Sequence, residues 1–132
     1  MNRVSIKSCN DGTELIFKVL RSSGESIDFI AEVSGSPFIG SVETSTYVSG
    51  PPSLLFSDIA KNWRGWKGEK TWSAIDGEFA LKASSNLTGS VRVIIEMVQM
   101  SGDFQLVATL GLEAGQLEAI SKRVSVLFQN DR

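Results

Sequence analysis

The stretch Asn62-Trp-Arg-Gly-Trp-Lys-Gly-Glu-Lys-Thr-Trp72, called the tryptophan segment below, contains all three tryptophans of the chain. It follows a run with helical periodicity and precedes a run with strand alternation, and two glycines interrupt it. An indole ring removes a large apolar area from water when it is buried. We therefore predict that the tryptophan segment connects a helix to a sheet and packs one against the other.

The residues before the tryptophan segment have the spacing of an amphipathic helix. Leu55, Ile59 and Trp63 fall four apart, so they would share one face of a helix over about residues 53–64. Gly65 is expected to end this helix as a C-cap glycine. The stripe predicts that Trp63 is buried in the core, whereas Trp66 lies off the stripe and its burial stays open.

A second helix is predicted near the end of the chain, and strands are predicted elsewhere. Leu117, Ile120 and Val124 lie on one face of a helix over about residues 113–128. Most other segments alternate polar and apolar side chains between short polar turns, which is typical of antiparallel strands. We predict one α+β domain over residues 1–132, with a meander-like antiparallel β-sheet of about seven to eight strands and two helices packed against it.

The residue composition excludes several kinds of chemistry. The chain has no histidine and a single cysteine, Cys9. Catalysis by Ser-His-Asp or Cys-His groups and zinc sites that use histidine are therefore excluded. No Gly-x-x-x-x-Gly-Lys-Ser/Thr sequence is present, so a phosphate-binding loop of that type is absent. We expect no cofactor, no metal site and no catalytic residue.

The charge and the apolar pattern bear on partners and location. The net charge is −2, which argues against nucleic acid as a partner because proteins that bind it are usually basic. No apolar run approaches the roughly 18 residues that a membrane-spanning helix needs. The first nine residues alternate polar and apolar side chains and lack the apolar core of a signal peptide. We expect a cytoplasmic protein that does not contact a membrane.

The tryptophan segment is also the strongest candidate for a contact surface. Arg64, Trp66 and Lys67 combine an aromatic ring with two cations, and tryptophan and arginine are enriched where proteins bind one another. The four cations from Lys61 to Lys70 could also hold a nucleic-acid backbone while the rings stack on bases. A solvated helix end explains the same charges, and the acidic chain favours that explanation.

Carboxylates cluster after the tryptophan segment. Glu69, Asp76 and Glu78 could supply the two carboxyl groups that acid–base catalysis requires at a fixed separation. Asp76 precedes a turn glycine and Glu78 begins a strand, so turn chemistry and surface charge account for both. We keep Glu69 and Glu78, together with Trp72, as candidate contact residues beside Trp66.

The chain contains, in this order, Asn62-Trp-Arg-Gly-Trp66, Trp72, Asp76-Gly-Glu-Phe-Ala-Leu81 and Leu112-Glu-Ala-Gly-Gln-Leu-Glu118. This ordered set resembles a family of small bacterial proteins classed as a domain of unknown function. The resemblance extends from the first predicted helix to the second and implies a bacterial, cytoplasmic protein. It implies no catalytic residues, because no activity is established for the family.

These observations favour a non-enzymatic protein that binds another protein, and neutralisation of a toxin by an immunity-like protein is one form of that function. The alternative is a small-molecule-binding protein or a weak hydrolase with a pocket beside Trp66 and Trp72. A homodimer is the third hypothesis, because an open antiparallel sheet leaves edge strands that need cover.

Overall fold

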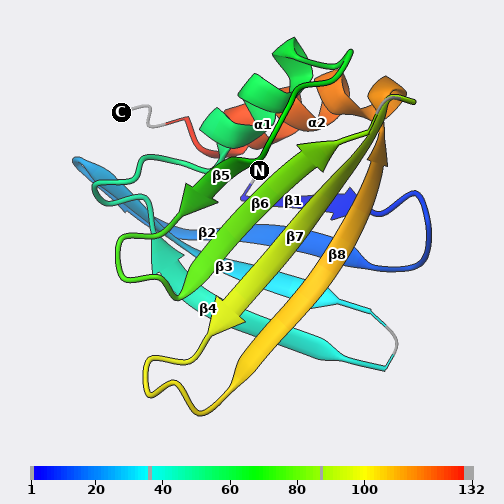
Figure 1. The fold of residues 1–132 in the computed structure, drawn as a ribbon. Coiled ribbons are helices and arrows are strands. Elements are labelled where there is room, and N and C mark those ends of the chain that lie inside the picture. The colour runs from blue at the N-terminus through cyan, green and yellow to red at the C-terminus, as the bar shows by residue number, and fades with distance from the viewer. Residues whose placement is uncertain (1, 36, 87, 130–132) are drawn as a thin grey trace.

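The structure is a computed structural model that describes residues 2–35, 37–86 and 88–129. These residues form two antiparallel sheets of four strands each and two α-helices (Figure 1). In each sheet the strands pair in the order in which they occur along the chain. Each half of the chain therefore has the same order of elements, a four-stranded meander followed by a helix.

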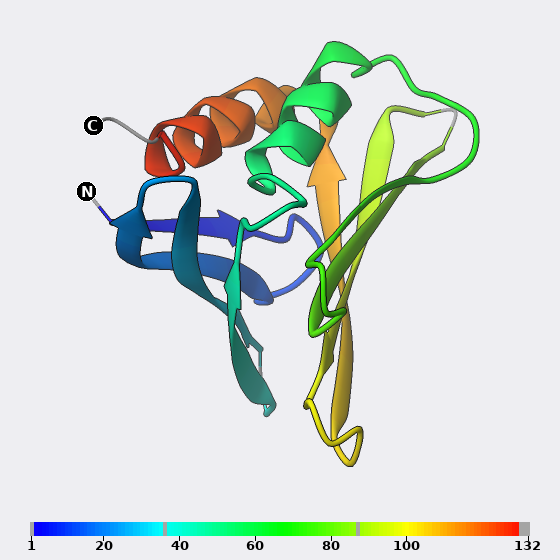
Figure 2. The ribbon, with the colours of Figure 1, turned by 90° about the vertical axis from the view of Figure 1, so that its left-hand side faces the viewer.

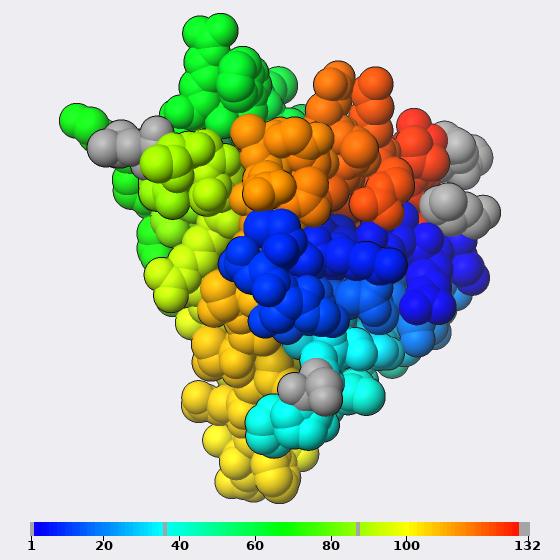
Figure 3. Space-filling view, turned by 90° about the vertical axis from the view of Figure 1, so that its right-hand side faces the viewer, coloured from blue at the N-terminus to red at the C-terminus, as the bar shows by residue number. Residues whose placement is uncertain are grey.

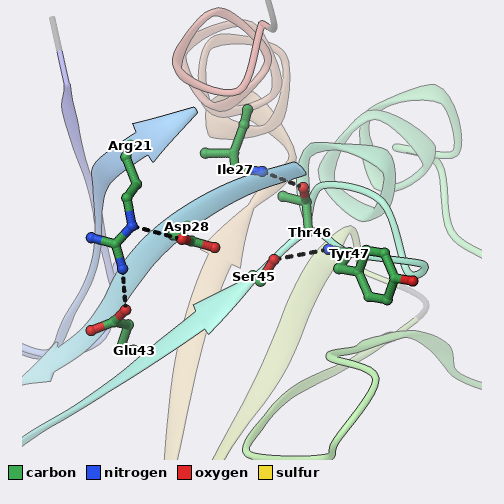
Figure 4. Close-up of polar contacts among 7 residues, drawn as sticks. All are labelled: Arg21, Ile27, Asp28, Glu43, Ser45, Thr46 and Tyr47. Atoms are coloured by element: carbon green, nitrogen blue, oxygen red, sulfur yellow. Dashed lines mark hydrogen bonds and ion pairs between the residues drawn. The ribbon is translucent and has the colours of Figure 1, made fainter. Parts of the chain in front are cut away.

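The first sheet contains β1 (Arg3–Lys7), β2 (Glu14–Ser23), β3 (Ser26–Ser34) and β4 (Ile39–Ser45). The strands β1 and β3 bury alternate residues, and a register shift between Val19 and Arg21 marks a bulge in β2. On the outer face, Arg21 donates to Asp28 of β3 at 2.8 Å and to Glu43 of β4 at 2.9 Å (Figure 4). Charged groups of three strands thus pair with one another on this face.

The rest of the chain contains α1 (Ser53–Lys61), β5 (Lys70–Ser73), β6 (Phe79–Ser85), β7 (Ser90–Val98), β8 (Gln105–Glu113) and α2 (Ala114–Leu127). The two helices pack against one another, α1 also contacts β5, and α2 also contacts β1. Figure 2 shows the two sheets facing each other, with both helices at one end and the β3–β4 and β7–β8 turns toward the other.

The core is an aromatic cluster to which both sheets and both helices contribute. Phe17 of β2 makes edge-to-face contacts with Phe56 of α1, Phe79 of β6 and Phe128 after α2, with ring centroids 5.6–6.3 Å apart. Phe29 of β3 lies 4.9 Å from Phe128. Edge-to-face pairs add to the free energy gained from the buried area alone. The cluster holds the two halves of the chain together.

The predicted α+β class, with antiparallel strands and two helices, is confirmed. The eight strands are divided between two sheets, since α1 and the tryptophan segment separate β4 from β5. The second helix matches its prediction closely. No helix in the described part of the chain has the length and apolar character needed to cross a membrane.

The first helix is shorter than predicted, and the burial predicted for Trp63 is wrong. The helix ends at Lys61, where the Asn62 side chain donates to Asp58 O at 2.9 Å. Trp63 therefore leaves the helical stripe and is 50% exposed. Gly65 has a φ of 118°, but it lies beyond the C-cap, which is Asn62. Local capping by asparagine prevailed over the four-residue periodicity.

Candidate functional site

Trp72 of β5 belongs to the core. Its ring lies 5.7 Å from Phe79 and 6.4 Å from Phe29, and only 6% of the residue is exposed. Its Nε1 donates to Gly50 O at 3.1 Å, which satisfies the polar atom of the indole. The predicted packing of the tryptophan segment against the sheet is therefore achieved by Trp72.

Trp66 is half-buried and packs against the core, but its Nε1 is buried without a hydrogen-bond partner among the described residues. Lys70 Nζ lies 5.3 Å from the ring centroid and also pairs with Asp58 at 3.0 Å. The Trp66 ring therefore contacts both the core and the ammonium group of Lys70. Arg64, by contrast, lies over Trp63, with its guanidinium carbon 5.0 Å from that ring centroid.

The other candidate residues from the sequence do not converge on one pocket. Arg64, Lys67 and Glu69 are exposed on the loop between α1 and β5. Glu78, just before β6, accepts a hydrogen bond from Thr44 Oγ1 of β4 at 2.6 Å. The second carboxylate oxygen of Glu78 is buried without a partner in the described residues. Glu78 thus joins the two sheets, whereas the exposed residues lie on the α1–β5 loop.

A surface that sequence reasoning missed lies at the end of the molecule opposite the helices. Its four large apolar side chains are 64–76% exposed and are called the apolar tip: Phe38, Ile39, Phe104 and Val107. Two hollows of about 390 and 450 Å³ run between β4 and β8 here, and Leu106 lines both. Figure 3 shows the start of β4 beside the β7–β8 end of the molecule.

The two sheets approach closely beneath the apolar tip. A Cβ atom added at Gly40 of β4 would lie 2.6 Å from Leu106 Cδ1 of β8, so only glycine fits there without a shift. The contact holds Ile39 of β4 beside Leu106, and Ile39 and Val107 line the same hollow. The apolar tip is thus composed of residues from both sheets.

The strand β8 also presents a free edge. Gly111 directs its backbone groups away from β7, since Cys9 N donates to Gly111 O at 2.7 Å and Gly111 N donates to Ser8 Oγ at 3.0 Å. Backbone direction alternates along a strand, so Gln105, Val107 and Thr109 direct their N–H and C=O groups the same way. None of these outward groups has a partner among the described residues.

The outer strand β1 is protected in a way that β8 is not. Arg123 of α2 donates to Ser5 O at 2.9 Å, and Gln116 donates to Lys7 O at 3.3 Å. These bonds occupy carbonyl groups on the β1 edge. Between residues 104 and 112 the chain has no charged residue and no proline, and the β7–β8 register is unbroken. Charged residues, prolines and bulges are the features with which edge strands usually avoid pairing, and this part of β8 has none of them.

Two further hollows lie away from the apolar tip. One of about 760 Å³ runs between α1 and α2 and is lined by Trp63, Ala60 and Leu117 among others. The other, of about 570 Å³, lies beside β6, β7 and β8 and is lined mainly by polar side chains. Neither these two hollows nor the two at the apolar tip are lined by Trp66, Trp72, Glu69 or Glu78.

The described residues hold no group of three or more acidic, cysteine or histidine side chains placed to bind a metal ion. The pKa of Asp11 is lowered, first because the backbone N–H of Thr13 donates to its carboxylate. The distance of that bond is 3.0 Å, and it closes the turn between β1 and β2. This shift therefore reflects turn structure.

Comparison with known families gives one match, over residues 6–131, to a family described as "Family of unknown function (DUF6228)". The chain belongs to this family. The match covers all eight strands except the beginning of β1, and both helices. No curated protein matches the chain. Membership therefore confirms the resemblance found in the sequence and supplies no activity.

Proposed function

We propose that this protein binds another protein through the apolar tip and the adjoining edge of β8. The observation that carries the proposal is the coincidence of four exposed apolar side chains with an unpaired strand edge. Scattered exposed apolar residues are normal on a soluble protein, but grouped ones mark interaction surfaces. The backbone edge adds hydrogen-bonding groups that a partner strand can satisfy.

The chemistry of the surface defines the partner that would fit it. An extended segment that pairs with β8 would meet the backbone groups of Gln105, Val107 and Thr109, and its alternate side chains would reach the apolar tip. The only charged residue from position 98 to position 112 is Asp103, in the β7–β8 turn. We therefore infer an extended partner segment with apolar side chains and a cation near Asp103.

The specific form that we propose is an immunity-like protein that neutralises its partner by covering it. This form requires binding and no reaction, which agrees with the lack of histidine and of nucleotide-binding sequences. Its test is co-expression with the protein encoded by the adjacent gene. Rescue of growth from a toxic neighbour supports the immunity-like form, whereas a harmless neighbour that binds at the apolar tip supports binding alone.

The proposed surface is tested with paired variants. Phe104→Glu and Val107→Lys introduce charge into the apolar tip and the β8 edge, and Val126→Lys introduces charge at an apolar side chain of α2 that is 56% exposed. Urea unfolding should show that all three variants fold. Affinity for the partner, measured by calorimetry, should fall at least about tenfold in the first two and stay unchanged in the third. Equal affinity in all three would overturn the proposal.

A homodimer would use the same edge, so its presence must be measured separately. Two copies can pair their β8 strands antiparallel without charge repulsion, because residues 104–112 are uncharged. Light scattering at two protein concentrations distinguishes the cases. A mass that doubles with concentration, and that Val107→Lys returns to the monomer value, would assign the edge to self-association instead of to a different partner.

A further inference from the structure

The polar hollow of about 570 Å³ lies on a part of the molecule that the proposed function does not use. Ser84 of β6, Arg92 of β7 and Gly111 of β8 are neighbours across three strands. The hollow is lined by these positions together with Thr109, Ser90, Asn86 and the loop residues Cys9 and Asn10. Its size is that of a typical small-molecule site.

One wall of the hollow depends on a glycine within a strand. The loop after β1 crosses to β8, where Ser8 and Cys9 bond to Gly111 through its N–H and C=O. The Asn10 side chain lies against Gly111, and a Cβ atom at position 111 would overlap the Asn10 amide nitrogen. Glycine in a strand interior often marks a site of close approach. Here it lets the loop form the wall.

The groups around the hollow include one cation, several hydroxyl groups and two side-chain amides. Arg92 is exposed and makes no ion pair or hydrogen bond with the described residues, unlike Arg21, which pairs with two carboxylates. No aspartate or glutamate lines the hollow. Asn86 Oδ1 already accepts from Thr88 N, Thr88 Oγ1 and Ser90 N, so its amide NH₂ remains as a donor.

We propose that this hollow binds a small ligand that carries a phosphate or carboxylate group. A guanidinium group can donate two parallel hydrogen bonds to such an oxyanion, and charge-assisted bonds of this kind are stronger than neutral ones. The hydroxyl groups of Ser84, Ser90 and Thr109 supply further donors near Arg92. Arg92 thus anchors the anion, and the hydroxyl and amide groups bind the rest of the ligand.

The proposal is tested by NMR titration with inorganic phosphate and with citrate, which separate the two anion types. The backbone amide chemical shifts of Cys9, Arg92 and Gly111 should change and reach a plateau as the concentration of at least one of the two anions rises. Arg92→Gln should weaken that binding about tenfold, because it removes the charge and keeps polar donors. Arg64→Gln, which removes an exposed arginine on the α1–β5 loop, should leave it unchanged.

A second readout comes from Cys9, the only thiol in the chain and a residue that lines the hollow. Alkylation of Cys9 by iodoacetamide, a neutral reagent, should slow when the bound anion is present, and this protection should be lost in Arg92→Gln. Absence of saturable shifts with both anions would overturn the proposal. The same holds if chloride causes equal shifts, or if Arg92→Gln binds as the natural chain does.

Discussion

Trp63 and Trp72 belong to one short segment, yet one is half-exposed and the other lies in the core. The sequence predicted the packing role of the segment, because three indole rings between a helix and strands need cover. It misplaced Trp63, because a four-residue spacing extends a predicted helix until something ends it. The Asn62 bonds to Asp58 end it at Lys61, and such side-chain capping competes with continuation of a helix.

This contrast predicts losses of stability of very different size for two similar substitutions. Trp72→Ala should lower the free energy of unfolding by about 3–5 kcal/mol, since it leaves a large cavity in the aromatic core. Trp63→Ala should lower it by less than about 1 kcal/mol, since surface substitutions rarely do more. Urea denaturation followed by circular dichroism measures both. Equal losses would show that Trp63 is packed as tightly as Trp72.

At the scale of the element, α2 shows why its boundaries were predictable. Glu113 is the N-cap, and its N–H donates to the Gln116 side chain at 2.8 Å. This contact between the N-cap residue and the third helical residue begins the helix directly after β8. The stripe formed by Leu117, Ile120 and Val124 is buried as predicted. Local signals and tertiary packing agree for this helix.

The Gln116 side chain makes two hydrogen bonds that one substitution would remove together. Its side chain caps α2 and also donates to Lys7 O on the edge of β1. Gln116→Ala should therefore lower the free energy of unfolding by about 0.5–2 kcal/mol. Glu118→Ala, on the exposed face of the same helix, is the matched control and should change it little. Thermal unfolding monitored by circular dichroism compares the two variants. Equal melting temperatures would show that the Gln116 bonds to Glu113 and Lys7 do not stabilise the fold.

The strand β8 and the residue before it show that alternation along a sequence does not predict which apolar side chains are exposed. Phe104, Leu106 and Leu110 alternate as in a strand with one buried face, but Phe104 is 72% exposed and Leu110 is fully buried. Alternation identifies which side chains share a face, and it does not show where the opposing sheet ends. Phe104 was missed for this reason, because it continues the core pattern of Leu106 and Leu110 yet is exposed just before β8 begins.

For the whole molecule, the sequence predicted the fold class and the order of strands and helices. It did not predict the division into two sheets, because β4 and β5 could equally have paired with one another in one meander. Their separation follows from tertiary structure: α1 and the tryptophan segment lie between them, and β4 packs opposite the second sheet at Gly40 and Leu106. The polar hollow was also invisible, since it needs a loop from β1 to cross to β8.

The bond between Thr44 and Glu78 tests how the two sheets are joined. Thr44→Val keeps the shape of the side chain but leaves the Glu78 carboxylate without its hydroxyl partner. We expect the free energy of unfolding to fall by about 1–3 kcal/mol, the usual cost of an unsatisfied buried group. Thr71→Val, on the exposed side of β5, is the control. In a Glu78→Leu background the effect of Thr44→Val should shrink, and an unchanged effect would exclude the pairing as its cause.

Each sheet comes from one continuous half of the chain, while each helix also contacts the edge strand of the other half. Cutting the α1–β5 loop would therefore divide the molecule into two fragments, residues 1–66 and 67–132, that each hold part of the aromatic cluster. We expect neither fragment to show a cooperative thermal transition alone and an equimolar mixture to regain one, measured by calorimetry. A mixture of the two fragments that shows no cooperative transition would contradict this expectation. The two fragments could therefore be fused to two other proteins, and their joint folding would report that those proteins bind each other.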